Sequence, residues 1–383
     1  MRLYVFGSSL TSAYWNGAAT YYRGLYKNLH ALGYHITFAE PDIYDRQRHR
    51  DWPADPPFAH CPVYRSRTEL QLHLRRARDA DLIIKHSGVG ADDEFLEAAV
   101  LDAAAAAPAG ARPRVAFWDV DAPATLAGLE AQPQHPLRRC LPGYDFVFTY
   151  GGGPPVVARY RRLGARACFP IYNGLDPDTH FPTAPDPRFQ ADLTFLGHRL
   201  PDRESRVRHF FFAAAALCPQ HRFLLAGEGW SEAEGGAQAA LPPNLRRAGF
   251  IAPPQHNALN SSARLVLNLN RDSMAQTGFS PPTRIFEAAG AGAAILSDAW
   301  PGMNLFFEPG REILLATGPQ QVAAHLQGLS PEAAAALGRR ARERALAEHS
   351  YHHRARRVHA LLLCPPRPAP ALPAAAEVPA LSA

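Results

Sequence analysis

A segment in the second half of the chain carries residue types that hold phosphate and ribose. It runs from Gly278 to Ser297 and reads GFSPPTRIFEAAGAGAAILS. The prolines define a loop, Thr283 is expected to cap a helix, and the N–H groups at that helix start form an anion site with Arg284. Glu287, one turn further on, can accept hydrogen bonds from two neighbouring ribose hydroxyls. The alternative is an ordinary surface ion pair between Arg284 and Glu287.

Two glycine-containing turns follow apolar runs that are typical of buried strands. Their candidate residues are Gly197, His198, Arg199, Arg203 and Glu228. Because ligands gather beyond the carboxyl ends of parallel strands, backbone amides and the cationic side chains of these turns could meet a diphosphate. A solvated turn is the alternative in both places, since the Gly-x-Gly pattern around Glu228 is weak evidence by itself.

Two carboxylates stand two positions apart at the end of another apolar run, at Asp119 and Asp121. A carboxylate within hydrogen-bond distance of a hydroxyl group can take up its proton, so either residue is a candidate general base. Asp121 precedes Ala122-Pro123 and could equally form a turn or cap a helix. No third metal ligand lies near this pair in the sequence, so we predict no metal site.

A long polar loop after the first apolar run brings hydroxyl, amide and aromatic groups together. Its candidate residues are Ser9, Trp15, Asn16 and Gly17. A loop of this length between a strand and a helix is usually functional or mobile. Gly17 would let a ligand approach the backbone closely, and Trp15 offers a ring on which a sugar could stack. The alternative is that the aromatic side chain only anchors the loop.

All these candidates follow short apolar runs that alternate with helical patterns. Strands are expected at 3–6, 35–39, 82–85, 115–118, 146–149, 193–196, 222–226, 265–269 and 293–297. Parallel strands need crossover helices, so the pattern predicts an α/β fold with two domains and a cleft between their sheets. The predicted parts are a first domain at 1–172, a linker at 173–186, a second domain at 187–350, a C-terminal helix end at 351–363 and a disordered Pro/Ala tail at 364–383.

Composition narrows the classes of protein further. The chain has 383 residues, of which 47% are hydrophobic, with 40 Lys+Arg against 35 Asp+Glu. This balance excludes disordered and collagen-like chains, and the scattered arginines predict no nucleic-acid partner. Five widely spaced cysteines indicate neither a disulfide framework nor a zinc site and suit a cytoplasmic protein. Without a long apolar run, integral membrane association is not expected, although peripheral contact is compatible with the sequence.

Histidines near the end of the chain do not favour a metal site either. His349, His352 and His353 lack the H-E-x-x-H pattern, and the expected structure is a helix end that is solvated or whose histidines complement the helix dipole. The patterns G-x-S-x-G, Walker A and a helix-opening G-x-G-x-x-G are also absent from the sequence. Hydrolase, kinase-like and nicotinamide-dependent functions therefore lose support.

Taken in order, several short motifs resemble those of GT-B nucleotide-sugar glycosyltransferases, and within them the CgeB-like, spore-maturation group. One motif has the form R-x-x-E-A-x-x-x-G-x-x-x-L and runs from Arg284 to Leu296. Others are FWDVDAPAT at 117–125, LTFLG at 193–197 and NGLDP at 173–177. Together they span most of the chain up to about residue 351. Related retaining enzymes carry a second glutamate eight positions before the first, where this chain has Phe279, so retention of configuration is not implied.

The resemblance implies the GT-B fold: two Rossmann-like domains facing across a cleft, with the C-terminal helix packed on the first. It implies transfer of a sugar from a nucleotide-diphosphate-sugar donor to the hydroxyl of an unidentified acceptor, without a cofactor or metal ion. Donor contacts would come from Gly197, His198, Arg199, Arg203, Glu228, Thr283, Arg284 and Glu287. The acceptor would lie near Ser9, Trp15, Asn16 and Gly17, with Asp121 or Asp119 as the base. The alternatives are a nucleotide-sugar epimerase on the same fold and a non-catalytic protein that binds nucleotide or sugar.

Overall fold

Seven parallel strands form the sheet of the first domain in the computed structural model, which describes residues 1–230 and 241–364. The strands are β1 (Arg2–Phe6), β2 (His35–Pro41), β3 (Val63–Tyr64), β4 (Leu82–His86), β5 (Arg114–Asp119), β6 (Phe146–Thr149) and β7 (Cys168–Pro170). They lie in the order β3-β2-β1-β4-β5-β6-β7, and every neighbouring pair is parallel. The order reverses at β1, which places a crevice at its carboxyl end.

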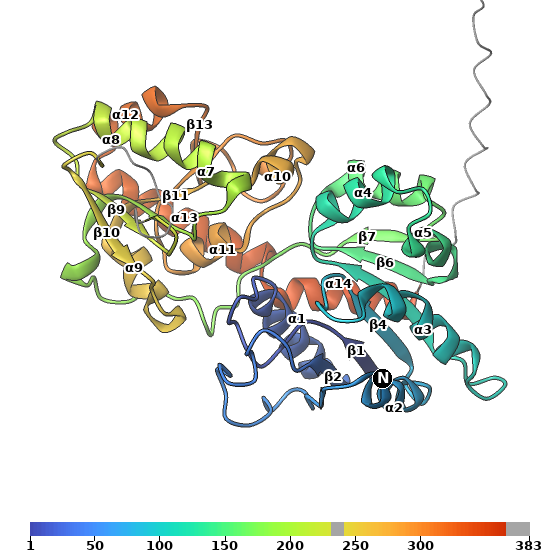
Figure 1. The fold of residues 1–383 in the computed structure, drawn as a ribbon. Coiled ribbons are helices and arrows are strands. Elements are labelled where there is room, and N and C mark those ends of the chain that lie inside the picture. Colours follow the sequence, from blue (N-terminus) through green and yellow to red (C-terminus); the bar gives the residue numbers. More distant parts are fainter. Residues whose placement is uncertain (231–240, 365–383) are drawn as a thin grey trace, which may run out of the picture.

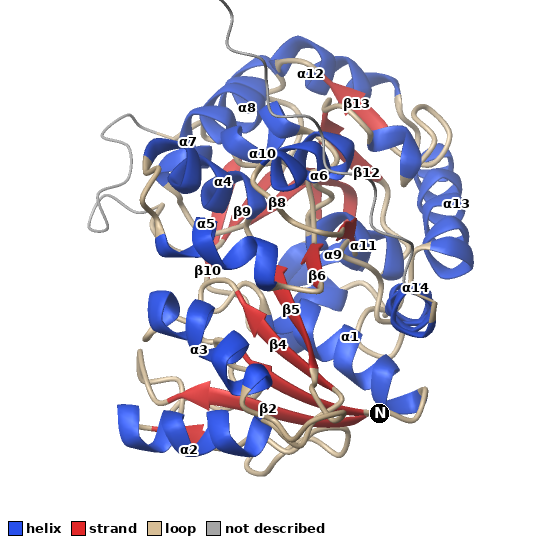
Figure 2. Cartoon of the chain, turned by 90° about the vertical axis from the view of Figure 1, so that its right-hand side faces the viewer, coloured by secondary structure: helices blue, strands red, loops and turns tan. Residues whose placement is uncertain are grey.

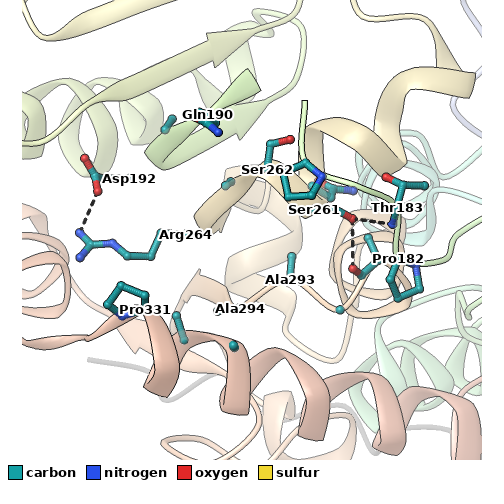
Figure 3. Close-up of a pocket in the computed structure, with 18 of the residues that line it drawn as sticks. Pro182, Thr183, Gln190, Asp192, Ser261, Ser262, Arg264, Ala293, Ala294 and Pro331 are labelled. Atoms are coloured by element: carbon teal, nitrogen blue, oxygen red, sulfur yellow. Dashed lines mark hydrogen bonds and ion pairs between the residues drawn. The ribbon is translucent and has the colours of Figure 1, made fainter. Parts of the chain in front are cut away.

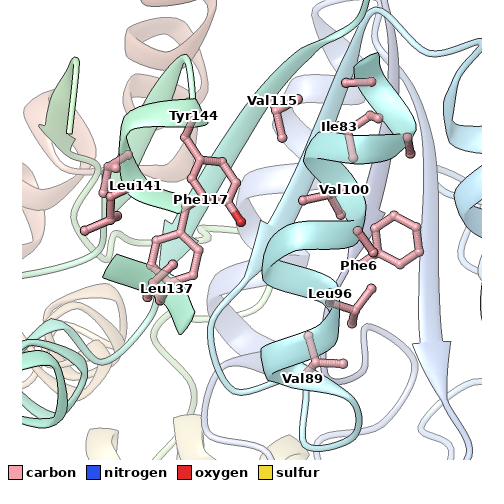
Figure 4. Packing of buried hydrophobic residues seen from close by; sticks show 14 of the residues in the cluster. Phe6, Ile83, Val89, Leu96, Val100, Val115, Phe117, Leu137, Leu141 and Tyr144 are labelled. Carbon is pink, nitrogen blue, oxygen red and sulfur yellow. The ribbon is translucent and has the colours of Figure 1, made fainter. Parts of the chain in front are cut away.

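Helices cover both faces of this sheet (Figure 1). They are α1 (Ala19–Ala31), α2 (Arg67–Ala77), α3 (Asp93–Ala105), α4 (Ala122–Ala131), α5 (Pro136–Cys140) and α6 (Gly153–Arg162). Because successive strand residues point to opposite faces, Phe6 joins the core under α3 whereas Val5 joins the core under α1. Figure 4 shows the first of these cores, where Leu96 and Val100 of α3 pack on the sheet. Both faces are buried, which explains why the strands read as unbroken apolar runs.

The second domain repeats this plan with six parallel strands in the order β10-β9-β8-β11-β12-β13. They are β8 (Ala191–Leu196), β9 (Phe223–Ala226), β10 (Leu245–Gly249), β11 (Ala263–Asn268), β12 (Ile295–Asp298) and β13 (Leu314–Ala316). Its helices are α7 (Pro201–Val207), α8 (Ala213–Leu217), α9 (His256–Ser262), α10 (Asp272–Thr277), α11 (Thr283–Gly290), α12 (Pro319–Gly328) and α13 (Pro331–Glu348), with a π-helical turn at Arg208–Phe212 between α7 and α8. The prediction of two parallel α/β domains is confirmed.

The chain crosses between the domains twice, and the two crossings pair with each other. The backbone N–H of Leu175 donates to His349 O at 2.8 Å, and that of Tyr351 donates to Leu175 O at 2.9 Å. After the second crossing, α14 (Tyr351–Leu363) lies along α1 of the first domain (Figures 1 and 2). The contact requires Gly24, because a Cβ there would overlap the ring of Tyr351. The expected return of the C-terminal helix to the first domain is therefore confirmed.

The helices α13 and α14 are separated at His349 and Ser350, because the chain crosses to the other domain at this point. The predicted tail beyond Cys364 lies outside the described residues. In the described part of the chain no helix combines the length and apolarity that a membrane crossing needs.

Candidate functional site

The start of α11 differs from the prediction in one detail. Pro282 has an extended backbone (φ −71°, ψ 154°) and occupies the cap position, so Thr283 is the first helical residue and not the cap. The helix therefore begins one residue earlier than expected, because Pro282 is the last residue with an extended backbone. The backbone N–H groups of the first turn still begin at Thr283, as an anion site requires.

Glu287 is a buried carboxylate, with only 7% of its surface exposed. Its Oε2 lies 3.6 Å from Nη1 of Arg284, and its Oε1 lies 4.0 Å from Nε2 of His180. Burial disfavours the charged form, but the positive fields of Arg284, His180 and His256 outweigh it and lower the pKa of Glu287. This environment excludes the alternative of an ordinary surface ion pair.

Polar atoms at this site lack partners. Oε2 of Glu287 and Nη1 of Arg284 are buried and find no hydrogen-bond partner among the described residues. Buried polar groups are nearly always satisfied, so such atoms indicate a place that a ligand or water completes. A carboxylate with an open lone pair beside an open guanidinium N–H can hold a hydroxyl-rich anionic ligand.

Arg203 lies beneath the turn that follows β8. Its Nη2 donates to His198 O at 2.6 Å, while its guanidinium lies 5.5 Å from the ring centroid of Phe195. Burial, together with the positive charges of Arg284 and Arg271, lowers the pKa of Arg203 to about 10. Three guanidinium groups therefore act on one region of the second domain. Nε of Arg203 has no hydrogen-bond partner within residues 1–230 and 241–364.

The turns after β8 and β9 brace each other. Nδ1 of His198 accepts from the N–H of Glu228 at 3.0 Å, and the N–H of Arg199 donates to Glu228 O at 2.9 Å. Gly227, with φ of 115°, is required because a Cβ there would overlap Gly197 O. The structure thus brings Gly197, His198, Arg199 and Glu228 together beyond the carboxyl ends of β8 and β9. The Arg199 side chain contacts the protein itself, with Nε donating to Oε2 of Glu204 at 2.7 Å.

A row of three aromatic side chains joins the two domains at these carboxyl ends. The Trp15 indole of the first domain stacks on the His198 imidazole, with centroids 6.1 Å apart and an interplanar angle of 21°. His198 stacks in turn on Phe250, at 6.4 Å and 8°. Trp15 is 70% exposed and has a left-handed backbone (φ 46°), an uncommon conformation for a bulky residue. The carboxyl ends of the two sheets therefore face each other.

Other residues of the loop after β1 hold Trp15 in place through hydrogen bonds. Nδ2 of Asn16 donates to Ser9 O at 2.7 Å, and Nη2 of the buried Arg46 donates to Trp15 O at 3.0 Å. Both Ser9 and Asn16 are buried, so the structure places them as loop-building residues. Gly17 is exposed, and nothing in the described chain lies within 4 Å of where its Cβ would be.

The two candidate bases have different surroundings although they are two positions apart. Asp119 is fully buried, and its oxygens accept from Ser87 Oγ at 2.8 Å, Thr125 Oγ1 at 2.9 Å and the Tyr160 hydroxyl at 2.5 Å. Burial raises the pKa of Asp119 against the opposing effect of these donors. It also accepts from the N–H of Asp121 at 2.9 Å. This geometry gives no support to Asp119 as a base and makes it the anchor of the loop that carries Asp121.

Asp121 occupies the cap position of α4 and reaches across the cleft. Its Oδ2 lies 2.9 Å from Nη1 of Arg271, in the loop after β11, and Nε of Arg271 lies 2.8 Å from Oδ2 of Asp202 on α7. Oδ1 of Asp121 is buried and accepts no hydrogen bond from the part of the chain that the structure describes. Sequence reasoning missed Arg271 because no motif marks it and its partner lies 150 residues away.

Phe279, in the position where related retaining enzymes carry a glutamate, lies at a contact between the domains. Its carbonyl accepts from Gly152 N at 2.8 Å, and its N–H donates to Pro301 O at 2.7 Å. Its backbone is left-handed (φ 49°), and a Cβ at Gly153 would approach the Phe279 side chain to 2.6 Å. Residues 151–153 follow β6, so this contact joins the loop after β6 of the first domain to the loop before α11 of the second.

The histidine near the end of the chain is not solvated as predicted. His349 is 7% exposed and packs against Phe286, Phe306 and Phe307, because the crossing between the domains is buried. Burial and the nearby Arg354 lower its pKa to about 3. Over residues 1–230 and 241–364, no three His, Cys, Asp or Glu side chains gather as metal ligands would.

A separate cavity of about 620 Å³ lies at the amino ends of the strands of the second sheet (Figure 3). It is bordered by Pro182, Thr183, Asp192, Ser261 and Arg264 among others, and includes no predicted site residue. Ser261 Oγ accepts from Thr183 N at 3.1 Å and donates to Ala291 O at 3.3 Å, so this side chain serves to hold the linker.

Comparisons with known proteins agree with this architecture. Residues 203–360 match the family model described as glycosyl transferase-like. The sequence matches no curated protein. Similar solved structures include sucrose-phosphate synthase from Thermosynechococcus elongatus, at 16% identity over 95% of this chain and 98% of that chain, with a TM-score of 0.65. HepE from Anabaena in complex with UDP-glucose aligns at 15% identity over 95% and 99% of the two chains, with a TM-score of 0.62.

A third similar structure is an α-glucosyltransferase in complex with UDP and a 13-mer DNA. It aligns at 12% identity over 95% of this chain and 100% of that chain, with a TM-score of 0.68. At these identities the likeness shows the fold, whereas the family model concerns the domain that carries Arg203, Arg284 and Glu287. The chain therefore has the two-domain GT-B fold and carries a glycosyltransferase-like domain at residues 203–360.

Proposed function

We propose that the protein transfers a sugar from a UDP-sugar to the hydroxyl group of an acceptor. The observation that carries this proposal is the buried, negatively charged Glu287 beside Arg284, each with an open hydrogen-bonding atom. Both residues lie in the glycosyltransferase-like domain, on the helix that begins with an anion-binding first turn. UDP is the preferred nucleotide because the similar HepE and α-glucosyltransferase structures contain it.

The donor would lie along the second domain. Glu287 would accept hydrogen bonds from the ribose hydroxyls, and the first turn of α11 with Arg284 and Arg203 would hold the diphosphate. These cationic groups stabilise the negative charge that builds up on the departing diphosphate. The turns containing His198, Arg199 and Glu228 border the same space.

The acceptor would lie on the first-domain side, between Trp15 and Asp121. As the acceptor oxygen bonds to the anomeric carbon, the bond from that carbon to the diphosphate breaks, and its electron pair remains on UDP. The acceptor proton passes to Asp121, which we retain as the candidate base. Asp119 acts through Asp121 by holding its loop.

Several finer assignments belong to the same proposal. We assign the chain to the CgeB-like group on the order of its motifs, and we place its activity in the cytoplasm without a cofactor, metal ion or nucleic-acid partner. Peripheral membrane contact is compatible with the sequence. The scattered arginines and the widely spaced cysteines support these assignments.

A thermal-shift panel tests the proposal. Purified protein is melted with UDP, GDP, dTDP, CDP and ADP and with their common sugar conjugates, because a ligand that binds the folded state raises the melting temperature. We expect a selective rise with UDP and one UDP-sugar. No rise with any nucleotide at millimolar concentration would contradict the proposal.

Product analysis with the bound UDP-sugar separates the alternatives. A transferase releases UDP, slowly to water when no acceptor is present. An epimerase alters the sugar without releasing UDP, and a non-catalytic protein leaves the donor unchanged. Either of these last two results would replace the proposed function.

A further inference from the structure

Arg271 is the side chain through which the second domain holds the candidate base. Its guanidinium lies between two carboxylates, with Nη1 2.9 Å from Asp121 Oδ2 in the first domain and Nε 2.8 Å from Asp202 Oδ2 in its own domain. All three side chains are about one-third exposed, so the cluster is open to the cleft. Arg271 therefore connects the proposed donor domain to the proposed base.

The loop that carries Arg271 is anchored from below. The N–H of Asn270 donates to the buried carboxylate of Asp298 at 3.3 Å, and Nη2 of Arg206 donates to Asp298 Oδ2 at 2.6 Å. Ser273 Oγ donates to Asp202 Oδ2 at 3.0 Å on the other side of the loop. The backbone is thus held in place, while the long Arg271 side chain can change partners.

The contact with Arg271 restricts what Asp121 can do. The ion pair with Arg271 takes up one side of Oδ2, so the guanidinium competes with an acceptor hydroxyl for the lone pairs of that oxygen. Oδ1 is buried. Proton transfer to Asp121 is therefore easier once Arg271 has moved to another anion.

A diphosphate is the anion best suited to draw Arg271 away. Arg203 follows Asp202, the second partner of Arg271, on α7, and the positive charges of Arg284 and Arg271 both help to lower the pKa of Arg203. A diphosphate offers several charged oxygens to a planar guanidinium, whereas Asp121 offers one accessible oxygen.

We propose that Arg271 couples donor binding to the availability of the base: it holds Asp121 until the donor binds, and the donor diphosphate then recruits Arg271 and frees Asp121 Oδ2 for the acceptor. This inference rests on the proposed function. It makes Arg271 a positioning residue, and it implies that the donor binds before the acceptor can react.

The coupling predicts effects of opposite sign on the affinity for UDP, measured by calorimetric titration. Asp121→Asn removes the competitor for Arg271, so UDP should bind about two- to fivefold more tightly, the range of a partly exposed ion pair. Arg271→Gln removes a charged hydrogen bond to the diphosphate and should weaken binding about tenfold or more. In the Arg271→Gln background, Asp121→Asn should have no further effect.

A matched control uses an ion pair of α4, the helix whose cap position Asp121 occupies. Glu130 on α4 pairs with Arg159 at 2.7 Å outside this cluster, and Glu130→Gln should leave UDP affinity unchanged. Circular dichroism and melting curves confirm that each variant is folded. Arg271→Lys keeps the charge without the planar fork and should fall between wild type and Arg271→Gln.

Two contrary results are distinguishable. If wild type binds UDP but Asp121→Asn does not tighten it, or tightens it equally without Arg271, the coupling is wrong and the proposed function stands. If wild type does not bind UDP at millimolar concentration, the proposed function fails and the coupling fails with it.

Discussion

The two sides of the cleft use their polar residues differently. In the first domain, Asp119 and Asn16 are satisfied by neighbouring protein groups. In the second domain, Glu287, Arg284 and Arg203 each keep a buried polar atom that has no hydrogen-bond partner in the described chain. The first side therefore uses Asp119 and Asn16 to build the loops that present Trp15 and Asp121, and among these residues only Asp121 keeps a buried atom without a hydrogen-bond partner in the described chain, whereas the second side keeps a cluster of charged groups open for a ligand.

The sharpest test of this contrast is Asp121→Asn. General-base catalysis contributes about 10²- to 10⁴-fold, so UDP release from the bound UDP-sugar should fall by about that factor. The fold should remain intact, because the ion-pair cluster that holds the Asp121 side chain is about one-third exposed. Steady-state kinetics with melting curves measures both quantities. A comparable loss of stability and turnover would give Asp121 a structural role instead.

Asp119→Ala should have the reverse effect. Four donors would lose their acceptor, and each buried donor left unsatisfied costs about 1–3 kcal/mol, so we expect a loss of about 3 kcal/mol or more in the free energy of unfolding. Urea denaturation measures this loss, and calorimetry should find that UDP affinity in the folded fraction changes by no more than the two- to fivefold expected for Asp121→Asn. Unchanged stability would mean that the network around Asp119 does not hold the loop.

Low pH should lower the free energy of unfolding through two buried histidines, one in the first domain and one at the crossing between the domains. This loss should begin at a higher pH than the loss of charge on Glu287. Burial lowers the pKa of His86 on β4 to about 3, and burial with Arg354 does the same for His349. The unfolded chain takes up these protons near pH 6.5 and the folded chain near 3, so stability is full above 6.5 and falls as the pH drops. Each histidine should cost about 2 kcal/mol between pH 6.5 and 5.

Urea denaturation at several pH values measures this slope. His349→Gln removes one titrating group, and His86→Gln removes the other, so each variant should show a flatter decline of stability with falling pH. A slope identical to that of wild type in both variants would show that other groups cause the acid sensitivity.

The sequence predicted best those strands whose burial is visible in the pattern of their own residues. β1 and β4 are buried on both faces, so their unbroken apolar runs predict them. β3, with two residues, and β7 and β13, with three each, are too short for any pattern to appear. β10 was missed because only Leu245 within it is buried. Tertiary pairing creates these edge strands.

The same distinction applies to the site. The spacing of Arg284 and Glu287 on one helix turn is a local property, and the prediction that they lie together holds in the structure. Asp119 and Asp121 look alike in the sequence, and only burial within the folded sheet separates them. Arg271 could not be found, because its importance comes from a partner on the other domain.

The central claim is that the second domain holds a preformed donor site around Glu287. Calorimetric titration of UDP into wild type, Glu287→Ala and the control Glu343→Ala, an exposed glutamate on α13, tests it most directly. The lost charged hydrogen bonds should weaken UDP binding to Glu287→Ala by about 1–3 kcal/mol, while the control binds as wild type does. Equal affinity for UDP in wild type and a folded Glu287→Ala variant would contradict the claim.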